Sequence, residues 1–169
     1  MIRWPQPNGE WIPPSQFIPI AEETGMIKAI GEWVIREACR QVQRWSAEAL
    51  PVQPVAVNVS ARQFRREGVV QTMKDMLRET GIPPTMLEVE LTESTVMADP
   101  VAAAKILHEI RGLGVHIAID DVGTGYSSLA CLKRFPVDTL KIDAAFVRDI
   151  ATDPDDAAIV SAILRSPIT

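Results

Sequence analysis

Two kinds of hydrophobic periodicity alternate along the chain. From Ile27 to Trp45, apolar residues recur every three or four positions, which predicts an amphipathic helix. Valines then alternate with smaller or polar residues over 55–60, which predicts a strand. The succession continues downstream with helices predicted over 69–80, 100–112 and 154–164, and strands over 87–93, 115–121 and 138–143.

Proline and glycine mark several predicted boundaries. Asp99-Pro100 and Asp153-Pro154 each place an aspartate at the N-cap and a proline at the first helical position. Gly81 follows the predicted helix 69–80 and is expected to end it. The first 25 residues are rich in Pro, Trp and Gly, and we predict a loop there that leads into the first helix.

Each predicted strand is aliphatic on one face and polar on the other towards its carboxyl end. The aliphatic positions are Val55, Val57, Val59, Leu87, Val89, Leu91, Ile117, Ile119, Leu140 and Ile142. An open doubly wound sheet carries helices on both faces and is apolar on both. A barrel with a charged mouth is apolar only outside. The sequence therefore favours an α/β fold, an incomplete TIM-type (β/α)8 barrel of parallel strands alternating with helices, over a complete open α/β sheet.

Composition narrows the class of protein. The 169 residues carry a net charge of -5, which argues against a polymeric nucleic-acid partner because neutralising phosphates needs a basic surface. No apolar run approaches the roughly 18 residues of a membrane segment, and the first residues lack signal-peptide character. We expect a single cytoplasmic domain.

Oxygen-bearing side chains and one lysine gather at the predicted carboxyl ends of the strands. They are Asn58, Glu90, Glu93, Asp120, Asp121 and Lys141. So many anions in one cavity repel each other, and a hard cation such as Mg²⁺ or Mn²⁺ removes the repulsion. The adjacent Asp120 and Asp121 can serve two ions, which suits phosphodiester hydrolysis. Lys141 could position or ionise the attacking water. A single strand-end Asp is more often a helix cap; the shared inward face favours a site.

Five short motifs, in this order, resemble those of the EAL domain family. They are Arg3-Trp4, Asn58-Val-Ser-Ala61, Glu90-Leu-Thr-Glu93, Asp120-Asp-Val-Gly-Thr-Gly-Tyr-Ser-Ser128 and Lys141-Ile-Asp143. The resemblance runs from Met1 to about Leu164. It implies a bacterial phosphodiesterase that opens cyclic di-GMP to linear pGpG on a barrel with two Mg²⁺ or Mn²⁺ ions. An enolase-like barrel would also use strand-end acids and a lysine, but it does not account for Asn-Val-Ser-Ala.

The resemblance also implies a role for each matching residue. The metal ligands would be Asn58, Glu90, Asp120 and Asp121, and the catalytic group would be Lys141. Arg3 and Asp143 would face the substrate. Glu93 would anchor the Gly-rich loop 123–128, which couples the site to a homodimer interface in the family. The two-residue alternation of the strand also favours Glu90 as the ligand. Glu90 lies on the same face of the strand as Glu88, whereas Glu93 lies on the opposite face. Regulatory or GGDEF-type domains are expected in the parent protein.

Three departures from the family pattern shape the expected activity. Met1 aligns with the Leu of Glu-Ala-Leu, so the signature Glu is absent, and the chain stops before the last barrel strands with a second metal-site Glu and a substrate-side Gln. Val122 replaces the usual Phe. We therefore expect 1–169 to be a partial EAL domain with little or no phosphodiesterase activity, whose open sheet edges favour dimerisation or aggregation. The alternative is a truncated or degenerate module that binds cyclic di-GMP or a partner protein without catalysis.

Overall fold

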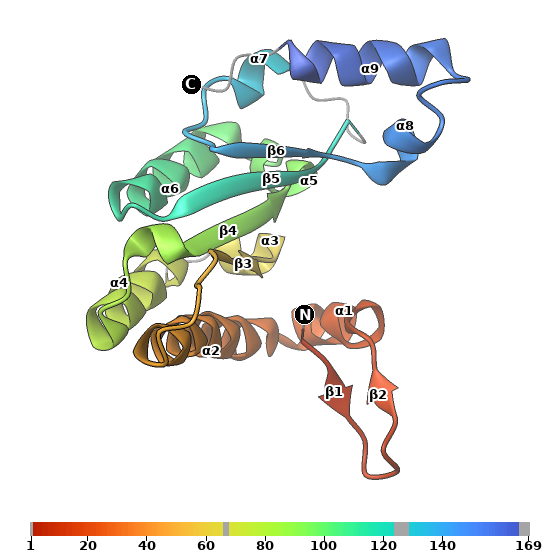
Figure 1. Cartoon of the computed structure of the whole chain (residues 1–169). Helices are drawn as coiled ribbons and strands as arrows, with labels where there is room; N and C mark the ends of the chain where they lie inside the picture. Colours follow the sequence, from red (N-terminus) through yellow and green to blue (C-terminus); the bar gives the residue numbers. More distant parts are fainter. Residues whose placement is uncertain (1, 66–67, 124–128, 166–169) are drawn as a thin grey trace.

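A parallel sheet forms the centre of the molecule. The computed structural model describes residues 2–65, 68–123 and 129–165. Within them, four strands lie in the order β3-β4-β5-β6 and every neighbouring pair is parallel. Their bounds are Val55–Asn58, Leu87–Thr92, His116–Val122 and Thr139–Ile142. Because the strands are parallel, their carboxyl ends meet at one edge of the sheet (Figure 1). Their sequence order and spatial order coincide, as the predicted βαβ units require.

Four long helices separate or flank the strands. They are α2 (Ile27–Ala47), α4 (Val69–Thr80), α6 (Pro100–Gly112) and α9 (Pro154–Leu164), close to the predicted ranges. Asp99 caps α6 by accepting a hydrogen bond from Ala102 N at 3.0 Å, which confirms the predicted helix start. No helix in the described ranges is both long and apolar enough to cross a membrane.

The N-terminal segment differs from the prediction. Instead of a loop, it forms an antiparallel hairpin of β1 (Trp4–Pro5) and β2 (Trp11–Ile12), followed by helix α1 (Pro14–Thr24). Proline at the first helical position lacks only an N–H that has no intrahelical partner anyway, so Pro14 is compatible with the helix start. Buried Phe17 and Ala21 hold α1 against the rest of the molecule.

Several short helices were not predicted. They are α3 (Ala61–Phe64), the 3-10 helix η1 (Pro84–Met86), α5 (Glu93–Met97), α7 (Leu129–Leu132) and α8 (Ala144–Arg148). The predicted strand 87–93 ends at Thr92, because Glu93 already begins α5. An element of one turn is too short to establish a hydrophobic period.

The two faces of the sheet differ as the sequence predicts. The aliphatic side chains of β4 and β5 that point outward are at most 1% exposed: Leu87, Val89, Leu91, Ile117 and Ile119. On the opposite face Ala56 and Asn58 are exposed, and Glu88 and Asp120 are partly exposed. The inward face also carries the buried Glu90 and Ala118, but it is polar and open at the other positions named here, which fits an incomplete barrel and not an open doubly wound sheet.

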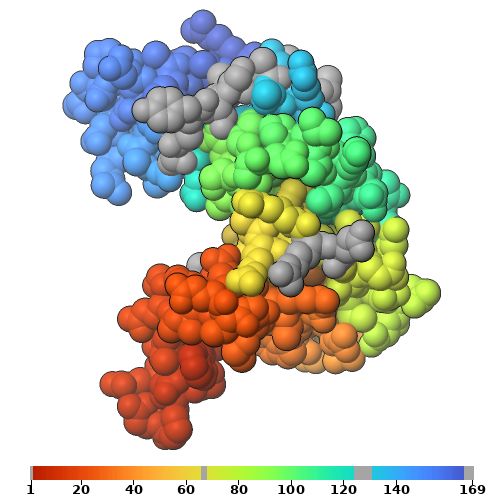
Figure 2. All heavy atoms as spheres, turned by 180° about the vertical axis from the view of Figure 1, so that it is seen from behind, coloured from red at the N-terminus to blue at the C-terminus, as the bar shows by residue number. Residues whose placement is uncertain are grey.

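The molecule is hollowed on one side. Figure 2 shows this hollow between the red and orange N-terminal segments and the blue C-terminal segments, with yellow residues near α3 at its back. Figure 1, seen from the other side, places the carboxyl ends of β4, β5 and β6 towards the same side. The strand-end residues therefore border an open space.

Asp138 joins three elements at the amino end of the sheet. Its Oδ2 accepts a hydrogen bond from Ile117 N in β5 at 2.9 Å, and its own N–H donates to Ile117 O at 2.9 Å. Its Oδ1 pairs with Arg111 of α6, and His116 Nδ1 lies 3.5 Å from the same oxygen. These contacts fix the start of β6 against β5 and α6.

We predict that Asp138→Ala lowers the free energy of unfolding by about 1–3 kcal/mol, because the Ile117 N–H loses its partner in a part-buried position. Urea denaturation followed by circular dichroism measures the loss. Asp75→Ala is the matched control, since Asp75 pairs with Arg78 on an exposed face of α4, and a change within about 0.5 kcal/mol is expected. Equal losses in both variants would contradict a special role for Asp138.

Candidate functional site

A chain of hydrogen bonds crosses the carboxyl end of the sheet. Asn58, the last residue of β3, donates from Nδ2 to Glu90 Oε2 at 3.0 Å. Lys141 of β6 donates from Nζ to Glu90 Oε1 and forms an ion pair with it. Glu90 is only 8% exposed, and these two donors compensate its buried charge. Three of the predicted site residues are thus in direct contact.

Lys141 is held in its charged form. Its hydrogen bond to Glu90 raises the pKa of the Lys141 ammonium, against a smaller opposite effect of burial, and the charges of Glu90, Glu88 and Asp120 raise it further. An ammonium group has three N–H donors. One is engaged by Glu90, so the group can also donate to a phosphate oxygen or a water molecule.

Asp120 and Asp121 share one position of the sheet. Ile119 pairs with Leu140 and Val122 pairs with Ile142, so both aspartates lie opposite Lys141 alone, in a β-bulge. Asp121 has φ 56°, in the left-handed region that Asp adopts more readily than most residues.

The bulge changes which side chain enters the core. Strict alternation would put Asp121 on the buried face with Ile119. The extra residue moves Val122 there, where it is 1% exposed, and Asp121 stays partly exposed. Both aspartates were predicted as site residues from the sequence, whereas the bulge that lets consecutive residues serve one site was not.

Three carboxylates lie close together at this end of the sheet. Burial raises the pKa of Asp121, and the charges of Asp120 and Asp143 raise it further. Asp120 Oδ1 accepts a hydrogen bond from Asp121 N at 3.0 Å. Asp143 caps α8 by accepting from Ala145 N at 2.7 Å, so it also has the ordinary structural role of a strand-end aspartate. The remaining repulsion around Asp121 favours a cation.

Glu93 contacts the first residue of the Gly-rich loop. It is 3% exposed, and its Oε2 accepts a hydrogen bond from Gly123 N at 2.9 Å. Gly123 has φ 107°, and a Cβ on it would lie 2.8 Å from Cε2 of Phe146 in α8. Residues 124–128 of the predicted loop lie outside the described residues, so the anchoring role of Glu93 stays a prediction.

Arg3 lies in the N-terminal segment, outside the four-stranded sheet that carries the strand-end residues. It precedes β1 of the N-terminal hairpin, is exposed, and donates from Nη1 to Ile2 O at 3.0 Å. The described contacts do not join it to the strand-end residues, and its role towards a substrate stays a prediction. Glu88, which was not predicted as a site residue, is close enough to Lys141 to raise its pKa.

The donor chemistry of the site fits a hard divalent cation. Among the described residues, no three His, Cys, Asp or Glu side chains are already gathered as a metal site. The oxygens of Asn58, Glu90, Asp120 and Asp121 are nevertheless of the type that Mg²⁺ and Mn²⁺ prefer. Each Glu90 oxygen accepts one hydrogen bond, and a carboxylate offers about four acceptor positions, so Glu90 can also bind a cation.

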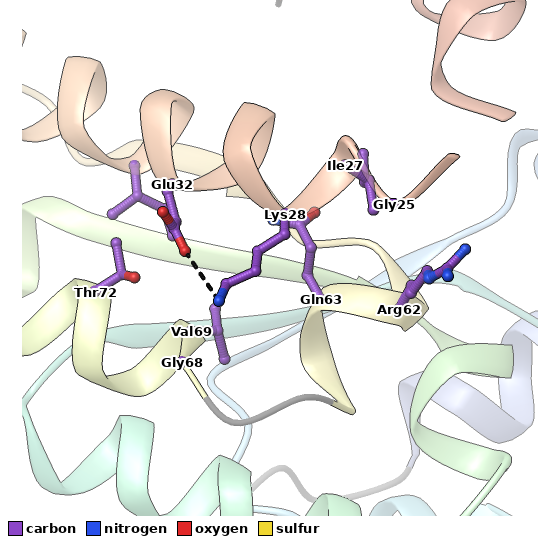
Figure 3. Close-up of a pocket in the computed structure, with 10 residues that line it drawn as sticks. Gly25, Ile27, Lys28, Glu32, Arg62, Gln63, Gly68, Val69 and Thr72 are labelled. Atoms are coloured by element: carbon purple, nitrogen blue, oxygen red, sulfur yellow. Dashed lines mark ion pairs between the residues drawn. The ribbon is translucent and has the colours of Figure 1, made fainter. Parts of the chain in front are cut away.

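A pocket described elsewhere on the molecule does not include the strand ends. It lies between α2, α3 and α4, and Figure 3 shows Lys28, Gln63 and Thr72 around it. The Lys28 ammonium forms an exposed ion pair at 3.8 Å with Glu32, one turn further along α2. An exposed pair of this kind contributes little to stability or binding.

The fold and the site together define an α/β barrel-type protein with an acidic strand-end site. A family model described as "EAL domain" matches residues 1–166, and the chain belongs to this family. This finding confirms the resemblance found in the sequence motifs.

Two curated relatives show the range of similarity. The chain is 48% identical over 164 residues to the "Bifunctional diguanylate cyclase/cyclic di-GMP phosphodiesterase MucR" of Pseudomonas aeruginosa, covering 97% of this chain and 24% of that protein. It is 40% identical over 164 residues to the "Cyclic di-GMP phosphodiesterase PdeR" of Escherichia coli, covering 97% of this chain and 25% of that protein. The chain thus spans about a quarter of the length of these relatives.

Solved structures share the fold. The "PaMucR Phosphodiesterase, c-di-GMP complex" superimposes with a TM-score of 0.88 at 49% identity, covering 95% of this chain and 65% of that chain. The FimX EAL domain of Xanthomonas citri in complex with c-diGMP gives a TM-score of 0.82 at 26% identity, covering 92% of this chain and 61% of that chain. These similarities confirm the predicted fold class, an incomplete TIM-type barrel.

We predict that Asp121→Asn stabilises the protein at pH 7 in the presence of a chelator, by roughly 0.5 kcal/mol. The pKa of Asp121 is raised in the folded state, so the folded protein binds a proton on the Asp121 carboxylate more tightly than the unfolded chain does. The free energy of unfolding therefore falls as pH rises from about 4 through the raised pKa. Asparagine keeps the size and the tolerance of positive φ but removes the charge.

Urea denaturation at pH 7 and pH 4 tests this prediction. The gain should be present at pH 7 and shrink towards pH 4, where both states are increasingly protonated. Glu109→Gln, on the exposed surface of α6, removes one charge away from the cluster and should show no such pH dependence. An Asp121→Asn variant that is less stable than the parent at pH 7 would show that repulsion does not dominate at this position.

We predict that Gly123→Ala lowers the free energy of unfolding by about 1–3 kcal/mol, since a positive φ and contact with the Phe146 ring both oppose a Cβ there. Gly112→Ala is the control, because nothing lies within 4 Å of its added Cβ and its position at the end of α6 is helical. This control should be neutral or slightly more stable. Thermal unfolding of both variants gives the comparison, and similar melting temperatures would contradict the prediction.

Proposed function

We propose that the EAL domain to which this chain belongs hydrolyses cyclic di-GMP to linear pGpG with two Mg²⁺ or Mn²⁺ ions. The observation that carries the proposal is the hydrogen-bonded series Asn58–Glu90–Lys141 beside the paired Asp120 and Asp121, at the carboxyl ends of neighbouring parallel strands. Relatives named as cyclic di-GMP phosphodiesterases support the substrate class.

The chain's own residues would divide the work as follows. Asn58, Glu90, Asp120 and Asp121 would hold the cations through oxygen atoms. The bound cations would supply Lewis acidity at the phosphate and an activated water. Glu90 orients the Lys141 ammonium, which would donate a hydrogen bond to a phosphate oxygen or to the attacking water.

The product defines which bond breaks. Linear pGpG retains a 5′ phosphate, so the water oxygen bonds to phosphorus while the bond from phosphorus to the 3′ oxygen breaks, and that oxygen takes a proton. Positive charge near the phosphate stabilises the developing negative charge in this step. Lys141 is suited to this role because it is held as an ammonium among carboxylates.

Other roles rest on the family resemblance. Arg3 and Asp143 would contact the substrate, and Glu93 would hold the Gly-rich loop through Gly123. A homodimer that uses this loop, and regulatory or GGDEF-type domains elsewhere in the parent protein, belong to the same proposal. The name of MucR, a bifunctional diguanylate cyclase and phosphodiesterase, supports such a multidomain arrangement.

A second candidate function is binding of cyclic di-GMP without turnover. Asn58 is exposed on β3, an edge strand of the described sheet, and the site opens onto the hollow in Figure 2. Catalysis requires placement of the reacting groups within a fraction of an ångström, and a small misplacement can cost on the order of 100-fold in rate. We therefore expect the 169-residue chain alone to bind Mn²⁺ but to turn over cyclic di-GMP slowly or not at all.

We predict that a chimeric phosphodiesterase domain containing this chain hydrolyses cyclic di-GMP. In it, this chain replaces the matching segment of the MucR phosphodiesterase domain, to which it is 49% identical. Lys141→Met in the chimera should lower the rate of pGpG release by about 100-fold or more, because it removes the charge that faces the phosphate. Lys105→Met, an exposed lysine on α6, is the matched control and should leave the rate unchanged. Chromatography of the nucleotide products gives the rates.

The outcomes separate the two functions. Turnover of the chimera that depends on Lys141 supports hydrolysis. Calorimetric binding of cyclic di-GMP by the chimera with no pGpG release would support the binding module and contradict hydrolysis. Turnover by the 169-residue chain alone at about 1 per second or more would show that this chain is a sufficient catalyst and that the expected low activity is wrong.

A further inference from the structure

We propose that Ala118 is a positioning residue of this site, because its methyl side chain leaves the space above β5 in which Lys141 and Glu90 meet. The proposal deepens the proposed function and rests on it for the catalytic meaning of the contact. The structural claim concerns three residues on three adjacent strands and can be tested without any substrate.

The Lys141–Glu90 contact joins strands that are not neighbours. Glu90 lies on β4 and Lys141 on β6, and β5 runs between them. Adjacent strands lie about 4.8 Å apart, so the two backbones are separated by roughly 9.6 Å. The two side chains must therefore bend towards each other over the inward face of β5.

Ala118 occupies the position of β5 beneath this contact. The register pairs Ala118 with Glu90 on one side and with Thr139 on the other. Lys141 lies one inward-facing position further along β6 and reaches back to Glu90. The line between the two charged groups consequently crosses β5 between Ala118 and Asp120, beside the Ala118 side chain.

Burial supports this arrangement. Ala118 is 0% exposed, whereas His116 and Asp120, its neighbours on the same face of β5, are both partly exposed. A small residue on an open face becomes inaccessible when longer side chains close over it. Glu90 lies beside Ala118 on β4 and Lys141 reaches towards it from β6, so we infer that these two long side chains cover Ala118.

A larger side chain at this position would occupy the same space. Valine adds two methyl groups and has little χ1 freedom, so they cannot turn away from the crossing side chains. Glu90 would then lose the ammonium while remaining largely buried, which is unfavourable for its charge. Lys141 would no longer be held where the proposed function needs it.

A double-mutant cycle in the 169-residue chain tests this inference. Glu90→Gln and Lys141→Met are made singly and together in the parent, in Ala118→Val and in Ala118→Ser. The free energy of unfolding of each variant is measured by urea denaturation. Direct contacts give non-additive effects and separated residues give additive ones. We expect non-additivity in the parent and in Ala118→Ser, and additivity in Ala118→Val.

A matched control separates crowding from a general effect of valine. Ala56→Val makes the same change on the same face of the sheet, in β3, where Ala56 pairs with Glu88. The cycle should remain non-additive in this background. If Ala118→Val does not fold, Ala118→Cys adds a single sulfur atom to the Cβ of residue 118 and should reduce the non-additivity.

The result is independent of hydrolysis. Non-additivity that is as large in Ala118→Val as in the parent would overturn the role of Ala118, even if the EAL domain hydrolyses cyclic di-GMP. Non-additivity that disappears in Ala118→Val but persists in Ala118→Ser and Ala56→Val would establish it, even if no pGpG is ever released.

Discussion

The two-residue period of the parallel strands is the constraint on which both the core and the site depend. In β4, Leu87, Val89 and Leu91 face the helices, while Glu88 and Glu90 face the open side. Burial of an aliphatic side chain contributes about 1.5–3 kcal/mol, so the outward residues hold the backbone firmly in place. The same backbone then fixes where the inward carboxylates lie. Stability and site geometry are two results of one alternation.

Charge at the carboxyl ends is unevenly balanced. Lys141 faces Glu88, Glu90 and Asp120, and its contact with Glu90 compensates the most buried of these carboxylates. Asp121 remains beside Asp120 and Asp143, and the repulsion among them favours protonation or a bound cation. Within the described residues, Lys141 thus compensates the Glu90 carboxylate, while burial and the neighbouring carboxylates raise the pKa of Asp121. This division agrees with a site whose oxygen donors suit Mg²⁺ or Mn²⁺.

The sequence predicted the long elements and the grouping of site residues, for a clear physical reason. Helices such as α2 contain several hydrophobic periods, and parallel strands bring their carboxyl ends together whatever the loops do. The N-terminal helix α1 was missed because Pro14 and Pro19 lie within a segment that reads as irregular. One-turn helices such as α5 offer no period at all.

The detailed geometry of the site could not be predicted from the sequence, except for the bulge. That Lys141 reaches Glu90 across an intervening strand depends on register, which alternation alone does not fix. The bulge at Asp120 and Asp121 did leave a signal, since Val122 is an aliphatic residue on the polar parity of its strand. An aliphatic residue out of phase with its strand is a useful sign of an inserted residue.

The bulge also separates what the core requires from what the site requires. Substituting Asp121 changes a charge, but deleting either aspartate would remove the extra residue that opposes Lys141. The alternation would then be strict, with Ile119 and Val122 still on the core face and one aspartate between them on the open face. Val122 would keep its place in the core, and Gly123 would still follow it towards Glu93 and the Phe146 ring. In this family member the number of aspartates is therefore set by the site and not by the core, since a strand with one aspartate would pack equally well but would offer a single carboxylate opposite Lys141.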